Sequence, residues 1–415
     1  MSLLAVVRAC TRRCSTYSMD EKIMRQIAAA LINHFRHEAV STTPGKREQT
    51  ATRAMFFAAG FATAAWAALV PFAKGNTGVG DGTLGLLLLC LGGGALVAMP
   101  ATGALTTRFG CRTILAAAVL AFSGVLPLLA LIPDPWVLAG ALLVFGVGIG
   151  TTDCAMNIQA ILVEKAADRP MMSGFHGYYS IGGIAGAGAM SGMMSLSLSP
   201  LAASTLAALA VLLLLAWNTG GLLTYANPPE GPAFAVPRGA VLVLGGICFA
   251  LFLAEGTVLD WSAVFLTEYR EVPEARGALG FACFSATMTL GRMTGDKVVA
   301  VLGPHRVVVL GALIGACGLL MTVFVPFWQA ALLGYALIGT GCANIVPVMF
   351  SAIGRQDSMP QAAAVPAVTT LGYLGILAGP ATIGFIAHHS GLPVAFLLIG
   401  VLFLAVAAAS KMVKM

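Results

Sequence analysis

The sequence predicts an all-α membrane protein in which two pseudo-symmetric six-helix bundles together cross the bilayer twelve times. Three observations predict this fold. First, 58% of the 415 residues are hydrophobic and only 10% are charged, whereas soluble domains carry about 25% charged residues. Second, the chain contains apolar runs that each have roughly the 20 residues needed for one membrane span. Third, a pattern in the first half of the chain recurs in the second half.

The apolar runs are separated by short breaks that carry proline, glycine or charge. The expected spans are residues 54–73, 82–105, 112–132, 136–160, 174–196, 200–225, 239–266, 277–300, 306–325, 328–352, 362–387 and 392–410. Residues 1–53 are rich in Lys and Arg, and we expect them to form a disordered cytoplasmic tail. Residues 226–238 are the expected cytoplasmic linker, so the bundles comprise residues 54–225 and 239–415.

The distribution of basic residues predicts the orientation. If the N-terminus is cytoplasmic, all but three of the 23 Lys and Arg residues fall on the cytoplasmic side, and the exceptions are Lys74, Arg270 and Arg276. This bias follows the positive-inside rule. We therefore expect a multi-pass protein of the inner (plasma) membrane with both termini in the cytoplasm. The net charge of +6 reports this topology, and no nucleic-acid partner is expected.

An internal repeat supports two related halves. Residues 145–170 align with residues 335–360 without a gap, so that Phe145 matches Tyr335 and Pro170 matches Pro360. Duplicated halves of six spans are typical of transporters.

The fourth expected span carries polar side chains where hydrocarbon is expected. Asp153, Asn157 and Glu164 recur at helical spacing and share one face. A charge at the bilayer centre costs about 2.5–3.5 kcal/mol on insertion scales, so such residues usually face a cavity and serve a function. Burial favours the neutral form of a carboxyl group, which suits proton coupling at Asp153. The alternative is a structural aspartate in a helix contact. Glu164, at the helix end, is expected to be solvated.

Further candidates for proton coupling or substrate binding lie in other spans. Glu255 and Asp260 occur in the segment LAEGTVLDW of the seventh span, where Asp260 beside Trp261 has an alternative role as an interfacial anchor. His176 opens the fifth span and titrates in a range suited to proton exchange, although a structural role is the alternative. Weaker candidates for substrate contact are Trp66, Asn344 and Tyr373.

Several motifs are absent from the sequence. There is no GxxxxGK[ST] phosphate-binding loop, no HExxH or GxSxG enzyme motif and no TVGYG-type filter. The nine cysteines form no CxxC pair. An enzyme is therefore not expected, nor is any metal or cofactor. Transport of a small-molecule substrate across the lipid bilayer, driven by a proton or sodium gradient, remains.

Two loops resemble the signature of the major facilitator superfamily. Residues 103–112, GALTTRFGCR, are similar to the pattern G-x-L-x-D-R-x-G-R-R, and residues 291–306, GRMTGDKVVAVLGPHR, are the counterpart in the second half. Thr107 stands where the pattern has Asp, whereas the second copy retains an acid, Asp296. The resemblance implies a conformational role for Gly103, Arg108, Gly110, Arg112, Gly291, Arg292, Gly295 and Asp296.

Within the superfamily, five segments resemble the bacterial YbjJ-like facilitators, a branch near the fucose-permease-like proton symporters. They are residues 64–72, 155–164 with 175–187, 253–261, 289–296 and 369–385. The resemblance implies a central cavity and alternating access by rocking of two bundles. We also expect the protein to be a monomer. Symport of a sugar or other small metabolite is the first expectation. Efflux of drugs or metabolites by proton antiport is one alternative, and a non-transporting receptor or scaffold is another.

Overall fold

The computed structural model describes residues 44–226, 236–273 and 276–414. Residues 46–415 form one compact unit, and the described part of it is built from α-helices and short 3-10 turns without a β-strand. The predicted all-α fold is thereby confirmed. Most of the expected tail, residues 1–43, and most of the expected linker, residues 227–235, lie outside the described residues.

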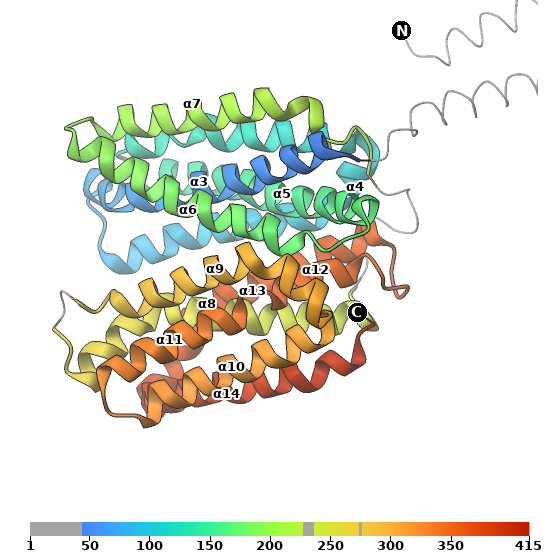
Figure 1. Cartoon of the computed structure of the whole chain (residues 1–415). Helices are drawn as coiled ribbons and strands as arrows, with labels where there is room; N and C mark the ends of the chain where they lie inside the picture. The colour runs from blue at the N-terminus through green and yellow to red at the C-terminus, as the bar shows by residue number, and fades with distance from the viewer. Residues whose placement is uncertain (1–43, 227–235, 274–275, 415) are drawn as a thin grey trace, which may run out of the picture. The chain divides into compact units, whose positions relative to one another are not determined.

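The first half consists of five long helices (Figure 1). They are α3 (Lys46–Thr77), α4 (Asp81–Val125), α5 (Pro135–Ala167), α6 (Met172–Ser195) and α7 (Pro200–Asn218), with the 3-10 turns η2 (Leu128–Ala130) and η3 (Thr219–Gly221). Because α3 begins at Lys46, residues 46–53 extend the first membrane helix, and their assignment to a disordered tail is wrong.

The second half contains seven helices in the described chain. They are α8 (Ala240–Arg270), α9 (Leu279–Leu302), α10 (Pro304–Phe324), α11 (Trp328–Cys342), α12 (Ile345–Ile353), α13 (Gln361–Ser390) and α14 (Leu392–Ala409), followed by η5 (Ser410–Met412). Together with the first half, these helices cover all twelve expected spans.

Two helices of the structure do not match the expected spans one to one. Helix α4 covers the second and third spans, and it bends at Gly110, whose φ of 79° is outside the helical region and suits glycine. The tenth span is divided into α11 and α12 at Asn344. Pro347 explains this break, because proline has no N–H to donate to the carbonyl of Ala343 and its ring crowds that carbonyl.

The helices of each half pack in pairs that bring glycine against backbone. In the first half α3 packs on α6 and α4 on α5, and in the second half α8 packs on α13 and α10 on α11. A side chain at Gly182 of α6 would meet the carbonyl of Phe57 in α3. Close helix approach through small residues is typical of membrane bundles. The two halves meet through α4 with α13 and through α6 with α9.

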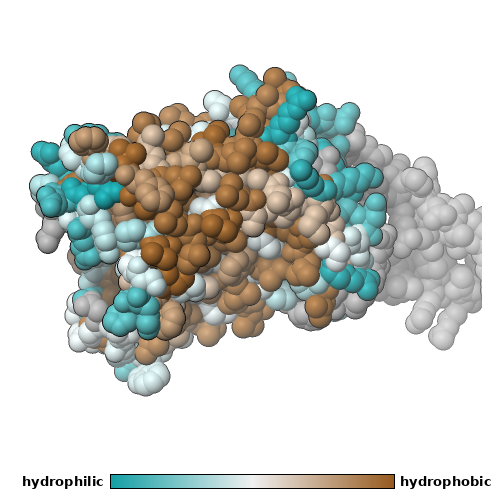
Figure 2. Space-filling model, turned by 90° about the horizontal axis from the view of Figure 1, so that it is seen from below, coloured by the Kyte–Doolittle hydropathy of each residue, from teal (hydrophilic) through white to brown (hydrophobic). Residues whose placement is uncertain are grey.

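The surface matches a membrane environment. Figure 2 shows hydrophobic residues across the middle of one face and hydrophilic residues at both ends. Nine helical stretches of the described chain are long and apolar enough to cross a membrane, and one of them, Gly82–Ala130, includes both segments of α4. Helices α6 and α9 are not among the nine. Helix α9 carries Arg292, Asp296 and Lys297, and α6 is rich in glycine.

Candidate functional site

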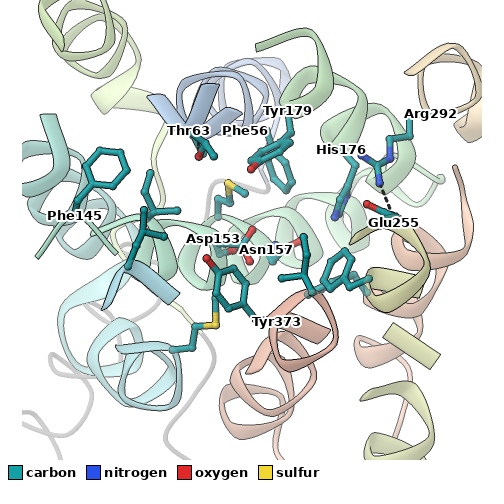
Figure 3. A pocket seen from close by; sticks show the side chains of 18 residues that line it. Phe56, Thr63, Phe145, Asp153, Asn157, His176, Tyr179, Glu255, Arg292 and Tyr373 are labelled. Carbon is teal, nitrogen blue, oxygen red and sulfur yellow. Dashed lines mark hydrogen bonds and ion pairs between the residues drawn. The ribbon is translucent and has the colours of Figure 1, made fainter. Parts of the chain in front are cut away.

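A cavity of about 250 Å³ lies between the two halves, near the middle of the long helices. Helices α3, α4, α5 and α6 line it from the first half, and α8, α9, α12 and α13 from the second half. Most of its wall is apolar or aromatic, with Phe56, Phe145, Tyr179, Phe252, Phe350 and Tyr373 among the lining residues. Its charged and polar side chains are few (Figure 3), namely Thr63, Asp153, Asn157, His176, Glu255 and Arg292.

On the wall from the second half, Arg292 of α9 holds an ion pair with Glu255 of α8. The Nη2 nitrogen lies 3.3 Å from Oε1 of Glu255, and both side chains are largely buried, 6% and 15% exposed. The Nη1 nitrogen donates to Oγ of Ser180 in α6, 3.1 Å away. A buried charge is tolerated when it is paired and hydrogen-bonded. Arg292 thus joins three helices from both halves.

The break between α11 and α12 provides a third partner for this arginine. Because Pro347 cannot donate to it, the carbonyl of Ala343 is left without its helical hydrogen bond. The Nε nitrogen of Arg292 donates to that carbonyl at 3.4 Å. All three guanidinium nitrogens therefore have partners within the protein.

The wall from α5 is different, because its polar groups lack partners. Asp153 and Asn157 are one helical turn apart and both line the cavity. The Asn157 amide nitrogen donates to the Asp153 backbone carbonyl at 2.9 Å, whereas its Oδ1 is buried without a partner. In the described chain, no hydrogen bond or ion pair reaches the Asp153 carboxylate. Figure 3 shows this pair apart from Arg292 and Glu255.

His176 lies on the first turns of α6 between aromatic rings of the two halves. Its ring centroid is 5.1 Å from that of Phe56 and 5.7 Å from that of Phe350. Its Nδ1 is 3.0 Å from the carbonyl of Met172. A carbonyl only accepts, so Nδ1 carries the proton. The histidine is thereby fixed in the cavity wall.

Both halves contribute acids to the beginning of α6. Glu164 of α5 accepts from the backbone N–H groups of Met171 and Met172, each at 2.8 Å. It is buried, so the expectation of a solvated Glu164 is wrong: its carboxylate satisfies donors that a helix N-terminus leaves free. Asp296 of α9 accepts from the N–H of Gly174 at 3.1 Å and connects the halves.

We refer to the end of the bundle where α3 begins and α14 ends, on the right in Figure 1, as the basic end. The loops and helix ends there carry most of the basic residues outside the cavity, including Arg108, Arg112, Lys165, Arg169, Arg306, Arg355 and Lys411. Besides Asp296 and Gly174, a hydrogen bond of 3.2 Å from Lys165 to Gln361 joins the halves there.

The loop signature in the first half lies at the basic end. A side chain at Gly103 would meet the carbonyl of Ala362 in α13, and one at Gly110 would meet that of Thr224. Arg112 donates to the carbonyls of Leu222 and Gly220, 3.0 Å and 3.3 Å away, and so fastens the end of the first half. Arg108 lies over the ring of Phe109.

In the second copy, Gly291 and Gly295 allow close packing around the broken span. A side chain at Gly291 would meet Ala343, and one at Gly295 would meet Asn344 and Ser173.

The structure brings five of the eight candidates for coupling or binding to the cavity: Asp153, Asn157, His176, Glu255 and Tyr373. The other three are not among the lining residues. Trp66 is buried beside Phe145, with ring centroids 6.3 Å apart. Asn344 donates to the carbonyl of Gly291 at 3.2 Å. Asp260 is exposed.

Sequence reasoning missed that Arg292 lines the cavity. The signal was present, because an arginine within an expected span is as costly as an acid and needs a partner. Ser180 and the carbonyl of Ala343 were also missed, because their roles depend on contacts between helices far apart in the chain.

Comparison with known proteins identifies the family. A family model described as transmembrane secretion effector matches residues 1–225. An uncharacterized MFS-type transporter of Yersinia pestis is 50% identical over 373 residues, which cover 89% of this chain and 97% of that protein. Membrane protein MosC of Rhizobium meliloti is 31% identical over 89% of this chain and 91% of its own length.

The chain belongs to the major facilitator superfamily. Solved superfamily structures share its fold at low sequence identity. The E. coli fucose:proton symporter FucP has a TM-score of 0.74 at 14% identity, covering 88% of this chain and 97% of that one. The human organic anion transporter MFSD10 has a TM-score of 0.71 at 15% identity, covering 88% and 99%. The chain is therefore a multi-pass membrane protein with the fold of a facilitator-type transporter.

Proposed function

We propose that the protein is a secondary active transporter that moves a small organic solute by alternating access and couples this movement to protons. The observation that carries the proposal is the cavity between the two halves, in which the ion pair of Arg292 and Glu255 connects helices from both sides. A cavity midway along the helices, lined by both repeats, is where transporters of this architecture bind substrate.

The contacts between the halves suggest which side the cavity faces. Gly103 with Ala362, Gly174 with Asp296, and Lys165 with Gln361 close the bundle at its basic end. We therefore infer that the cavity opens to the opposite end in this state. By the positive-inside rule the basic end is cytoplasmic, which puts both termini in the cytoplasm and the protein in the inner membrane. This is the outward-facing state of the cycle.

Glu255 is the proposed site of proton coupling. In the ionised state it neutralises Arg292 and links α8 to α9. A proton on Glu255 removes that charge, and Arg292 is then held by Ser180 and the Ala343 carbonyl alone. An unpaired buried charge is costly, so protonation favours rearrangement of α9 against α8 and α6. One of the contacts between the halves at the basic end, that of Gly174 with Asp296, joins α6 to α9.

The remaining candidates have supporting roles in this proposal. Asp153, Asn157 and Tyr373 contact the solute, and His176 fixes the beginning of α6 within the cavity wall. The loop residues from Gly103 to Arg112 and from Gly291 to Asp296 control how the halves separate. The transporter works as a monomer, since the cavity is enclosed by one chain.

The test is the pH of lightly buffered everted membrane vesicles as sugars, organic acids and cationic compounds are added one at a time. A compound-specific pH change that is absent in the double variant Asp153→Asn, Glu255→Gln supports proton-coupled transport. An unchanged response in the double variant, with both proteins inserted in equal amounts, contradicts it.

A non-transporting receptor or scaffold with the same fold is the second candidate, since a fold does not fix function. Its partner-binding element would be the basic N-terminal segment. Removing residues 2–43 leaves α3 intact from Lys46. Unchanged transport in this truncated protein favours the transporter, whereas a full-length protein that inserts normally and transports none of the compounds favours the receptor.

A further inference from the structure

We propose that the solute recognised in the cavity is a small protonated amine with an apolar body, held by the Asp153 carboxylate and the Asn157 side-chain oxygen. This inference rests on the proposed transport function and adds the chemical class of the substrate. It departs from the sugar that the family resemblance suggests. Its basis is a difference between the acceptors and the donors of the cavity. The acceptor oxygens of Asp153 and Asn157 have no hydrogen-bond partner among the described residues, whereas the strongest donor, Arg292, already has partners.

The unused polar groups of the α5 wall are acceptors. The Asn157 amide nitrogen faces the Asp153 carbonyl at 2.9 Å, and only the nitrogen end of the amide is able to donate to it. The oxygen end is consequently directed elsewhere, buried and without a partner. The Asp153 carboxylate, an acceptor when ionised, receives no hydrogen bond from the described residues. A ligand with N–H donors satisfies both groups.

The strongest donor of the cavity is already engaged by the protein. Each of the three guanidinium nitrogens of Arg292 donates one hydrogen bond, to Glu255, Ser180 and the Ala343 carbonyl, which together use three of its five N–H groups. An anionic ligand would compete with Glu255 for the same guanidinium group. With Glu255 and Arg292 neutralising each other, Asp153 is the remaining acid of the cavity, and a protonated amine beside it would stabilise its ionised form.

The rest of the wall suits an apolar cation better than a sugar. Phe56, Phe145, Tyr179 and Tyr373 line the cavity together with aliphatic residues. Aromatic faces attract ammonium groups and pack against apolar bodies. A sugar of similar size would bring several hydroxyl groups to this largely apolar surface, where unmatched polar groups are penalised.

Four probes with one common ring separate the possibilities: 2-phenylethylamine, 2-phenylethanol, phenylacetate and the trimethylammonium analogue of the amine. Binding to the purified full-length protein in nanodiscs is measured by calorimetry. The amine is expected to bind about tenfold to a hundredfold more tightly than the alcohol or the acid, as hydrogen bonds to a charged group warrant. The trimethylammonium analogue, which has no N–H, binds more weakly than the amine.

Asp153→Asn is expected to remove this preference for the amine, because it keeps the shape of the side chain and removes its charge. The matched control is Asp260→Asn, a carboxylate of α8 outside the cavity, which leaves the affinity of the amine unchanged. Equal binding of amine and alcohol, preferred binding of the acid, or binding of none of the four overturns the inference. Compound-specific pH changes in the vesicles with acids or sugars only would overturn it and leave the transport function standing.

Discussion

The two copies of the internal repeat form corresponding helices that differ in whether the backbone is broken. In the first half, α5 continues unbroken through Asp153 and Asn157. At the matching positions the second half has Ala343 and Pro347, and the span divides into α11 and α12. In the first copy the Asn157 side chain donates to the carbonyl of residue 153. In the second copy Arg292 donates to the carbonyl of residue 343.

This difference determines which charges are paired. The broken span gives Arg292 a carbonyl acceptor beside Glu255, so the charges of the second half are mutually satisfied. In the part of the chain that the structure describes, no basic side chain pairs with Asp153 of the unbroken α5, so this carboxylate faces the cavity without a counter-ion. The broken copy thus supports the coupling pair of Glu255 and Arg292 on one wall, and the unbroken copy carries the ligand-binding pair of Asp153 and Asn157 on the other. The predictions below test this division of roles.

The largest effect is expected from breaking the paired wall. Arg292→Leu leaves Glu255 buried without its partner, and removing one member of a buried ion pair costs about 3–5 kcal/mol. Thermal unfolding of the purified variant measures the loss. The double variant Arg292→Leu, Glu255→Leu should recover much of it, because no unpaired charge remains. Equal losses in the single and double variants would show that the pair is not coupled.

The unpaired wall gives the matched comparison for stability. Asp153→Asn removes a carboxylate that no described residue neutralises, so the same thermal assay should detect little loss or a slight gain in stability. A loss as large as that of Arg292→Leu would mean that Asp153 has a structural partner.

A further large effect is expected from copying the second half into the first. Asn157→Pro places proline at the position that matches Pro347, and proline in a helix interior costs about 3 kcal/mol or more. Here no arginine is available to satisfy the freed carbonyl of Asp153. The free energy of unfolding should therefore fall by at least this amount, whereas Asn157→Ala should lower it by about 1 kcal/mol for one hydrogen bond. Equal effects of the two variants would contradict the role assigned to Arg292.

A smaller loss of stability than that of Asn157→Pro is expected at the two loop signatures. Asp296→Asn weakens the contact with the N-terminus of α6, and loss of a helix cap costs about 0.5–2 kcal/mol. Because this contact joins the two halves, its loss should shift the equilibrium toward the state in which the halves are separated at the basic end. Asp168 and Ala300 lie on opposite sides of a pocket at that end. The distance between spin labels at these two residues measures the shift.

The matching change in the first copy is Thr107→Val. The Thr107 hydroxyl donates to the carbonyl of Gly103 within its own helix at 2.9 Å, so the label distances should stay as in the wild type. A shift of equal size in both variants would rule out the asymmetry between the two loops.

Composition and apolar run length were sufficient to predict the helical membrane fold, because the cost of exposing polar backbone to lipid leaves few alternatives. Helical spacing also placed Asp153 and Asn157 on one face. The pairing of Glu255 with Arg292 was not predictable, because it depends on how α8 and α9 pack. The tail was misjudged at residues 46–53, whose polar composition conceals a helix that continues into the first span. The solvated role expected for Glu164 failed because the beginning of α6 turns back onto it.

The central claim, that one wall couples protons and the other binds the solute, is tested most directly by transport into proteoliposomes with single variants. Exchange of labelled for unlabelled 2-phenylethylamine requires binding and alternating access without net proton movement, whereas accumulation driven by a pH gradient also requires coupling. Glu255→Gln should retain exchange and lose gradient-driven accumulation, and Asp153→Asn should lose both. Accumulation that persists in Glu255→Gln, or exchange that persists unchanged in Asp153→Asn, would contradict the account.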